Sequence, residues 1–555
     1  MVILLSPRQD RRVREHVTGG QVAEIADKQR ILKALFRQRP ALLAASSSVP
    51  EYNFDQHHTM RQLITPQLPL GGVDIAAIVI DASSRDDIPR LLRGLQYIYM
   101  TPAVRAEVFS ILAELVPVGD DGAPVDTTTG RPGMTQWQIL VLGMLRLGLN
   151  ADYDRIGELA NQHRTVRQML GVSDFADETT WHVQTLKDNL RLFTPELLER
   201  INAVVVKAGH AVVNKSPGDA LEVRCDSFVV ETNVHYPTDT NLLYDAVRKV
   251  IETSAGLCDA AALSDWRQHD YNVRCLKKAY RRTQQLKRSR AKNETKRAAR
   301  DAELRQAYVD YLNLAQSFLV RAAITRAKLL NDKGLPVFLL TALDDYVGHA
   351  ERQIGQIRRR VLDGERIPHA EKVFSIFEPH TEWITKGKAG VPVELGLRVA
   401  VTEDQFGFIL SHRVMQKETD DQVAVPLVED LARRFTNLAS VSMDKGFHSP
   451  DNQKRLAEIV PFPVLPKKGR CNAVEAQREA TSRFRRLRHQ HSAVESAINA
   501  LEVHGLDRCP DHGIAGFQRY VALAVVARNV HRLGAILLAE DAEEQREDRQ
   551  RQRAA

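Results

Sequence analysis

Three acidic residues that are far apart in the chain lie in segments that could bring them together. Asp226 is in the middle of an apolar and β-branched run, Asp444 directly follows a second such run, and Glu495 lies in a run with helical spacing. These patterns predict two strands, at residues 221–230 and 439–443, and a helix at 482–503. Carboxylate oxygens are ligands for Mg²⁺, and a cluster of such acids can hold two cations for phosphoryl transfer.

Asp226 has a simpler explanation when it is taken alone. An ionised carboxylate in a buried strand costs several kcal/mol, on the order expected for an uncompensated charge, unless a cation lies beside it. Arg224 is two residues earlier on the same face of the strand. Asp226 could therefore be paired with Arg224 or lie at a sheet edge, and only the partner acids favour a metal site.

The helix around Glu495 combines an apolar and a polar stripe. Its apolar stripe consists of Leu487, Val494, Ile498 and Leu501, and the neighbouring polar stripe consists of Arg488, His491, Glu495, Asn499 and Glu502. Glu495 therefore borders the core side of the helix. A surface position is the usual explanation for one such Glu, so its weight comes from the two acids on strands.

The other elements of the C-terminal half alternate between strands and helices. Residues 373–377, 393–401, 406–415 and 462–465 have the pattern of strands, and 422–435, 450–459 and 514–538 have that of helices. After the first strand, Thr238 or Asp239 is the expected N-cap of a helix. The order of these elements predicts an α/β fold, with a charged tail at 539–555 that frays.

The N-terminal half predicts helices alone. Residues 1–80 have no assigned function and include a linker at 44–50. Residues 86–116 predict two helices, the second capped by Thr101-Pro102. Short helices between 134 and 206 are compatible with a DNA-binding helix-turn-helix or with an ordinary helical core. In the DNA-binding interpretation His163, Arg164 and Arg167 are the expected phosphate contacts.

A long helical insertion, residues 260–361, follows the first strand, and Gly334-Leu335-Pro336 predicts the turn between two long helices. Its segment 277–300 contains eleven Lys or Arg residues and one acid, Glu294. A solvated helix face is the ordinary explanation, but a phosphate backbone would relieve the mutual repulsion. The candidate contacts are Lys277, Lys278, Arg281, Arg282, Lys287 and Arg288.

Composition sets the remaining bounds. The chain of 555 residues is 43% hydrophobic with a net charge of +7, which suits several domains and a polyanionic partner. Five scattered cysteines without a C-x-x-C motif argue for a reducing compartment and against a zinc finger. Early charges after the first residues argue against a signal peptide, and the apolar runs are shorter than a membrane span, so we expect a soluble protein.

Four sequence blocks resemble one family. The blocks are CDSFVVETNVHYPTD, FEPHTEWITKGKAG, SMDKGFHSP and HSAVESAINALEVHGLDRCPDHG, and the likeness extends over residues 86–538. The chain resembles DDE-type insertion-sequence transposases, most closely the ISNCY-like group. The resemblance implies an RNase H-like mixed sheet with flanking helices, a large helical insertion after the first core strand and an all-helical N-terminal region.

The resemblance also assigns the site. It implies that Asp226, Asp444 and Glu495 are the catalytic triad and the ligands of two Mg²⁺ ions, with Mn²⁺ as a substitute. Related enzymes often place Tyr, Arg and Lys around the Glu, where this chain has Arg488, His491 and Glu502. Arg488 and His491 are therefore the better candidates for gripping DNA. Further phosphate contacts, chosen by charge and loop position, are His380, Lys386, Lys388, Lys467, Lys468 and Arg470.

The implied function is transposition through hydrolysis at the element ends and attack of a freed 3′-hydroxyl on target DNA. The partners would be terminal inverted repeats, target DNA and at least a second copy of the chain, with no membrane, in the bacterial cytoplasm at the nucleoid. The expected domains are 1–80, a DNA-binding region at 81–210, a catalytic domain at 211–538 interrupted by 255–370, and the tail. The alternatives are a non-catalytic DNA-binding derivative and a metal-dependent nuclease without strand transfer.

Overall fold

The computed structural model describes residues 62–65, 70–116, 133–173, 178–216, 218–289, 293–385 and 393–554. The predicted linker at 44–50 lies outside these residues. The described residues fall into two compact units, which we treat separately. One unit is the helical segment 235–379, and the other contains the described residues of 54–234 and 380–555.

The larger unit is built on one mixed sheet. Strands β3, β1, β5 and β6 are neighbours in that order; β1 is antiparallel to β3 and parallel to β5, and β5 is parallel to β6. Both β2 and β4 pair with β3, while the short β7 pairs with β1. This is the predicted RNase H-like arrangement. The strands are β1 (Leu221–Thr232), β2 (Glu382–Thr385), β3 (Val393–Asp404), β4 (Ile409–Met415), β5 (Leu438–Met443), β6 (Phe462–Val464) and β7 (Arg508–Cys509).

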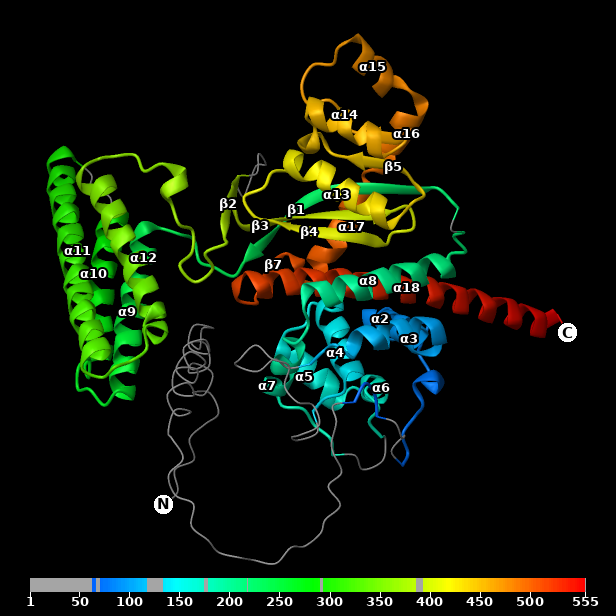
Figure 1. Cartoon of the computed structure of the whole chain (residues 1–555), viewed down its shortest axis with the longest axis horizontal. Coiled ribbons are helices and arrows are strands. Elements are labelled where there is room, and N and C mark those ends of the chain that lie inside the picture. The colour runs from blue at the N-terminus through cyan, green and yellow to red at the C-terminus, as the bar shows by residue number, and fades with distance from the viewer. Residues whose placement is uncertain are drawn as a thin grey trace, which may run out of the picture. The chain divides into compact units, whose positions relative to one another are not determined.

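Helices that precede and follow the strands in the sequence lie beside this sheet (Figure 1). Before β1 the described elements are helical, as predicted: α2 (Asp87–Met100), α3 (Pro102–Leu112), α4 (Gln136–Gly148), α5 (Tyr153–Gln162), α6 (Arg164–Met169), α7 (Val183–Leu190) and α8 (Pro195–Val212), with a 3₁₀ turn at Ile75–Ala77. The later helices are α13 (Asp420–Arg434), α14 (Pro450–Ile459), α15 (Ala473–Ala480), α16 (Ser482–Gln490), α17 (Ala493–Leu501) and α18 (Gly513–Ala554). Buried side chains of the N-terminal helices, the sheet and α18 form one core.

Two glycines let α2 and α18 approach closely. A Cβ atom added at Gly94 would lie 2.3 Å from the carbonyl oxygen of Val530, and one at Gly534 would lie 1.7 Å from that of Arg90. Only glycine leaves room for the facing backbone at this crossing. Farther along, the Arg93 guanidinium makes a bidentate ion pair with Asp541, at 2.8 and 3.0 Å. The helix therefore continues past residue 539, where fraying was predicted.

Helix α18 is long and apolar enough to cross a membrane by composition alone. A window of it has a mean hydropathy of 1.5, but 78% of that window is buried inside the protein. Its Val521, Val525 and Leu533 belong to the core shared with the sheet. In this fold α18 is therefore a core helix.

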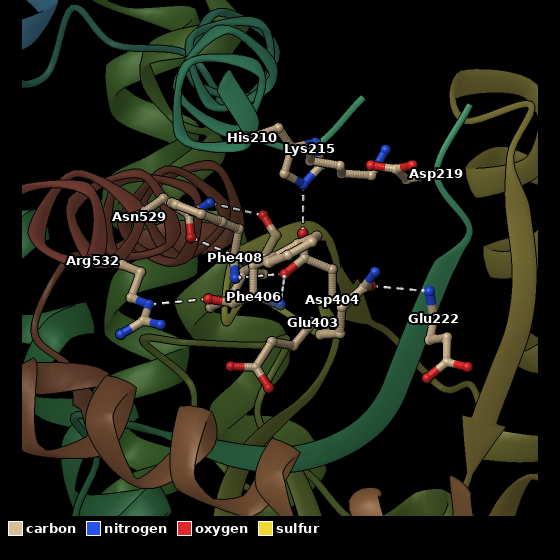
Figure 2. Close-up of polar contacts among 12 residues, drawn as sticks. His210, Lys215, Asp219, Glu222, Glu403, Asp404, Phe406, Phe408, Asn529 and Arg532 are labelled. Carbon is tan, nitrogen blue, oxygen red and sulfur yellow. Dashed lines mark hydrogen bonds and ion pairs between the residues drawn. The ribbon is translucent and has the colours of Figure 1, made fainter. Parts of the chain in front are cut away.

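The turn between β3 and β4 is held by a buried carboxylate, Asp404 (Figure 2). One Asp404 oxygen accepts hydrogen bonds from the backbone N–H groups of Phe406 and Phe408, at 2.9 and 3.0 Å. The other lies 2.6 Å from Nε2 of His210 on α8. From α18, Arg532 donates to the carbonyl oxygen of Phe406 at 3.0 Å. Because residues 406–408 form this turn, β4 begins at Ile409 rather than at the predicted residue 406.

The helical unit contains the segment predicted as an insertion, but it begins earlier, with α9 (Asp239–Ala260). It also comprises α10 (His269–Arg288), α11 (Glu294–Asn331) and α12 (Thr341–Ile357), followed by a π turn at Arg358–Leu362. Thr238 is the N-cap of α9, and its side chain accepts from the Asn241 N–H. The predicted turn at residues 334–336 lies between α11 and α12. Asp239 is the first residue of α9 and forms an ion pair with Arg360 at 3.0 Å.

Two predicted elements are wrong. Residues 373–377 do not form a strand, because the Ser375 hydroxyl accepts hydrogen bonds from the N–H groups of Phe377 and Glu378 and closes a local turn. The helix predicted at 482–503 is broken into α16 and α17 at His491 and Ser492, and it ends in a π turn at Glu502–Leu506. Glu495 therefore lies in the first turn of a short helix. The polar stripe predicted to run from Arg488 to Glu502 is not continuous.

Candidate active site

Asp226 lies in the central strand β1, opposite Val401 of β3. It is half-buried, and one of its carboxylate oxygens accepts a hydrogen bond from the N–H of Ser227 at 2.7 Å. Strand β1 forms because its β-branched and apolar residues pair on both sides, with β3 and β5. The carboxylate is thus fixed on a strand inside the sheet, so the sheet-edge explanation is wrong.

Arg224 does not compensate Asp226. Its guanidinium donates to the carbonyl oxygens of Asp404 and Gln490, at 2.6 and 3.3 Å. It also lies 3.8 Å from the carboxylate of Glu403, its cross-strand neighbour. The pairing that the sequence offered as the simpler explanation is therefore replaced by contacts with the β3–β4 turn and the end of α16.

The two partner acids come from elements that border β1. Asp444 directly follows β5, which is parallel to β1, and it precedes a 3₁₀ turn at Lys445–Phe447. Glu495 lies in the first turn of α17, which packs on β1 and β3. Both side chains are exposed. The larger unit thus brings together the parts of the chain that contain all three acids.

The electrostatics of Asp226 reflect this arrangement. Burial raises the pKa of Asp226, the Ser227 N–H lowers it, and the negative charges of Asp444, Asp420 and Glu495 raise it further, to about 6. Among the described residues, the three predicted acids lie too far apart for one oxygen of each to be within 4.8 Å of the others. The acids repel one another and together favour a cation among them.

Asp420 is a fourth acid that the sequence analysis missed. It is the first residue of α13, and its carboxylate accepts a hydrogen bond from the Ser227 hydroxyl at 2.7 Å. A Cβ atom added at Gly446 would lie 3.0 Å from the other Asp420 oxygen, so the turn after Asp444 passes close to it. The available signal was the acidic pair Asp420-Asp421 at a helix start. An acidic pair at a helix start usually has no role beyond its favourable interaction with the helix dipole.

His491 lies among the acids, in the break between α16 and α17. Its Nδ1 is 2.9 Å from the Ser442 hydroxyl at the end of β5. Burial lowers the pKa of His491, although Asp444 and Glu495 act to raise it. The other predicted DNA contact on this segment, Arg488, is half exposed and lies 3.9 Å from Glu479.

The predicted phosphate contacts near the sheet have different surroundings. Lys467 forms an ion pair with Glu475 at 2.6 Å, whereas Lys468 and Arg470 are exposed on the same loop. The His380 ring is half-buried and packs edge-on against Phe517 of α18, with ring centroids 5.6 Å apart. Lys386 and Lys388 lie outside the described residues.

Among the N-terminal candidates, two side chains stabilise local structure. His163 caps α6 by accepting from the Val166 N–H at 3.3 Å. Arg167 donates to backbone carbonyls, including that of Thr179 at 3.0 Å. Arg164 is exposed on the same helix. A role in DNA binding would therefore have to be added to these structural roles.

In the helical unit, the predicted basic residues are exposed on α10. Lys277, Lys278, Arg281 and Arg282 line a groove together with Glu303 and Asp310 of α11. Arg282 forms an ion pair with Glu303. Lys287 and Arg288 lie in the exposed last turn of α10. The basic run is thus divided between two helices and partly balanced by facing acids.

Comparison with known proteins gives one family. Residues 355–530 match the family model described as a transposase DDE domain, which covers the sheet from β2 to β7 and most of its later helices. A search of curated proteins and a search of solved structures found no match. The match excludes Asp226, because the insertion separates β1 from the matched segment. This match shows that residues 355–530 are similar to a transposase DDE domain, which supports a DDE-type transposase.

Proposed function

We propose that this protein is a DNA transposase of the ISNCY-like group that binds the terminal inverted repeats of an insertion sequence and performs metal-dependent strand cleavage and strand transfer. Asp226, Asp444 and Glu495 are its catalytic residues. One observation carries the proposal: Asp226 lies on β1, Asp444 directly follows the neighbouring parallel strand β5, and Glu495 lies on α17, which packs on β1, although the three residues come from distant parts of the chain.

The donor set fits a hard divalent cation. All three proposed ligands offer carboxylate oxygens, which Mg²⁺ prefers and Mn²⁺ also accepts. Two bound cations would activate the attacking oxygen and stabilise the leaving one. Asp226 is oriented by the Ser227 N–H, which occupies one of its oxygens and leaves the other available. Asp420 adds negative charge and orients the Ser227 hydroxyl.

DNA would be held by basic side chains, some of which belong to the same unit as this site. Lys468 and Arg470 are exposed on the loop that follows β6, and Arg488 is half exposed at the end of α16. His491 lies beside the acids, where burial favours its neutral form, which can donate or accept a hydrogen bond. The remaining proposed contacts are Lys467, His380, Lys386, Lys388, His163, Arg164, Arg167, Lys277, Lys278, Arg281, Arg282, Lys287 and Arg288.

The test is an assay of cleavage and joining on the DNA that borders the coding region. We expect Asp226→Ala, Asp444→Asn and Glu495→Gln each to lower the rate by at least about 10²-fold, and EDTA to abolish the reaction. Asp451→Asn is the matched control, since Asp451 is an exposed acid on α14, the helix that follows Asp444. Unchanged activity in Asp226→Ala would overturn the catalytic assignment.

The same assay separates the alternative functions. Pre-cut ends that are joined to a target plasmid indicate a transposase, whereas cleavage without joined products indicates a nuclease. DNA binding without either reaction indicates a non-catalytic derivative. Because two ends must be joined, the proposal includes at least a dimer on DNA, which light scattering of the end complex would measure. A cytoplasmic, nucleoid-associated location is part of the same proposal.

A further inference from the structure

A second cluster of potential metal ligands lies in the larger unit, on elements other than those of the acidic site. Asp87 is the first residue of α2, His504 lies in the π turn after α17, and His531 lies within α18. Nε2 of His531 is 2.9 Å from one Asp87 oxygen, and Nε2 of His504 is 3.7 Å from the other. One potential ligand atom from each residue lies within 4.8 Å of the others.

One of the two imidazoles, that of His531, is buried, that of His504 is nearly so, and both are incompletely bonded. The His531 side chain is 8% exposed and that of His504 is 13% exposed. Nδ1 of each ring is buried without a hydrogen-bond partner among the described residues. Protein hydrogen bonds therefore do not account for Nδ1 of either ring, and a buried polar atom of this kind indicates an ordered water or ion at Nδ1 itself, not at the Nε2 atom that faces Asp87.

The protonation of the cluster also suits a cation. Burial lowers the pKa of His531 to about 4, and burial likewise lowers the pKa of His504, so both rings are neutral near pH 7. Burial acts to raise the pKa of Asp87, but His531, His504 and Arg90 outweigh it and lower the pKa, which leaves a carboxylate. Neutral imidazole and ionised carboxylate are the forms that bind metals.

We propose that Asp87, His504 and His531 form a site for a divalent transition metal of the Zn²⁺ class, completed by solvent. Two imidazoles and one carboxylate are ligands that Zn²⁺ accepts, whereas Mg²⁺ prefers oxygen alone. With metal–ligand bonds of about 2.0–2.2 Å, tetrahedral ligands lie roughly 3.3 Å apart. The two Nε2 atoms lie near this distance from the carboxylate, at 2.9 Å from one Asp87 oxygen and 3.7 Å from the other.

Two arginines face the cluster and must be taken into account. Arg90 lies 2.9 Å from Asp87, but its side chain is 42% exposed and can turn into water. Arg528 is half-buried, and its charge acts on both histidines, although Glu403 lies beside it with the opposite charge. These charges lower the affinity for a cation. They do not occupy the histidine nitrogens.

The site would fasten the helix of Glu495 to the core. His504 is followed by Gly505, which has a φ of 112°, and a Cβ atom there would lie 2.9 Å from Asn150. Glycine therefore permits the π turn that directs His504 toward α2 and α18. A bound ion would tie the end of α17 to both helices, and this inference does not depend on the proposed catalytic function.

The test uses the full chain after removal of metals by a chelator. Asp226→Asn and Glu495→Gln are introduced together to weaken binding at the acidic site. We expect one equivalent of Zn²⁺ by calorimetry, and we expect Co²⁺ to show the visible absorption of a tetrahedral nitrogen-containing site. All-oxygen octahedral sites show only weak absorption. Bound Co²⁺ that lacks the tetrahedral bands would overturn the proposal. This measurement does not depend on whether any further variant folds.

Variants then assign the ligands. His504→Gln and His531→Gln should each weaken Zn²⁺ binding at least tenfold and remove the bands, with circular dichroism as the check on folding. The matched control is His235→Gln in the helical unit, because His235 also lies 2.6 Å from an aspartate, Asp245, but belongs to no three-ligand cluster among the described residues. Binding that persists in both cluster variants would contradict the assignment.

Discussion

At the scale of single residues, the acidic site opposes stability. Asp226 is half-buried, Arg224 two residues before it binds elsewhere, and the charges of three other acids act on it. Its pKa is therefore about 6, above the ordinary value of 3.8. The folded chain binds this proton more tightly than the unfolded chain does. Ionisation of Asp226 consequently costs free energy in the absence of a divalent cation.

We expect Asp226→Asn to stabilise the metal-free protein in EDTA, although the same substitution abolishes activity when Mg²⁺ is present. The gain in free energy of unfolding should be about 1–3 kcal/mol above pH 6, since a shift of one pKa unit is worth about 1.4 kcal/mol and Asp226 retains some solvent contact. Asn keeps an oxygen for the Ser227 N–H. As pH falls from 6 to below 4, Asp226 becomes protonated and the gain should vanish. Denaturant unfolding at pH 7.5 and pH 4 measures the difference.

Glu231→Gln is the control for this prediction. Glu231 is half-buried on the same strand, but it forms an ion pair with Arg508 at 2.7 Å. Its replacement should leave stability unchanged or lower it by up to about 1 kcal/mol. Equal stability of Asp226→Asn and the wild type at pH 7.5 would contradict the electrostatic account of Asp226.

Asp420 offers a second prediction at this scale. Its charge helps to raise the pKa of Asp226, so Asp420→Asn should lower that pKa and move the acidic limb of the pH–rate profile to lower pH by a fraction of a unit. Asn can still accept from the Ser227 hydroxyl. Initial rates at subsaturating Mg²⁺, where protons and metal compete for Asp226, measure the shift. The same change at Asp421 should leave the limb in place, and a limb that moves to higher pH in Asp420→Asn would refute the argument.

At the scale of elements, the buried carboxylate of Asp404 fixes the β3–β4 turn (Figure 2). Asp404→Ala would leave two backbone N–H groups and Nε2 of His210 without their partner. We expect a loss of about 3 kcal/mol in the free energy of unfolding of the larger unit, because unsatisfied buried groups cost roughly 1–3 kcal/mol each and the turn can relax in part. Denaturant titration followed by near-ultraviolet circular dichroism measures the loss.

The next residue supplies the control for Asp404. Gln405 is exposed, and among the described residues its amide bonds to backbone groups of Glu222 and Ala220. Gln405→Ala should cost less than about 1 kcal/mol, in the range of surface substitutions and single hydrogen bonds. Similar losses in both variants would show that the turn, rather than the buried carboxylate, determines stability.

The elements that were predicted correctly are those whose structure is determined by residues close to them in the sequence. The strand around Asp226, the cap at Thr238 and the helix that begins after Thr101 follow from local pattern and capping chemistry. Residues 373–377 have the same strand pattern, but the Ser375 hydroxyl forms a competing turn there. The helix with Glu495 breaks at His491, whose ring contacts Ser442 on a distant strand. Local pattern cannot reveal such a contact.

The candidate site was predictable only where chemistry and pattern coincide. Asp226 and Asp444 stand out because acids are rare on and beside apolar strands. Asp420 has the ordinary position of an acid at a helix start, so only the contact with Ser227 distinguishes it. Asp87, His504 and His531 come from three elements far apart in the sequence, and nothing in their local sequence joins them. Long-range packing supplies that information.

At the scale of the whole molecule, the open question is whether the insertion binds DNA or has only a solvated basic face. Lys277, Lys278 and Arg281 line the groove on α10, where the facing acids of α11 offset part of their charge. If each contacts one phosphate, replacing all three by Ala should reduce the steepness of log K against log[salt] by about 2–3, since each contact contributes roughly 0.9. Lys333, Arg352 and Arg366, exposed in the same unit, form the control set for removal of equal charge. Fluorescence anisotropy with the element ends over a series of salt concentrations gives both slopes. Equal slopes for the two triple variants would assign the basic run to solvent and restrict DNA binding to the unit that contains the acidic site.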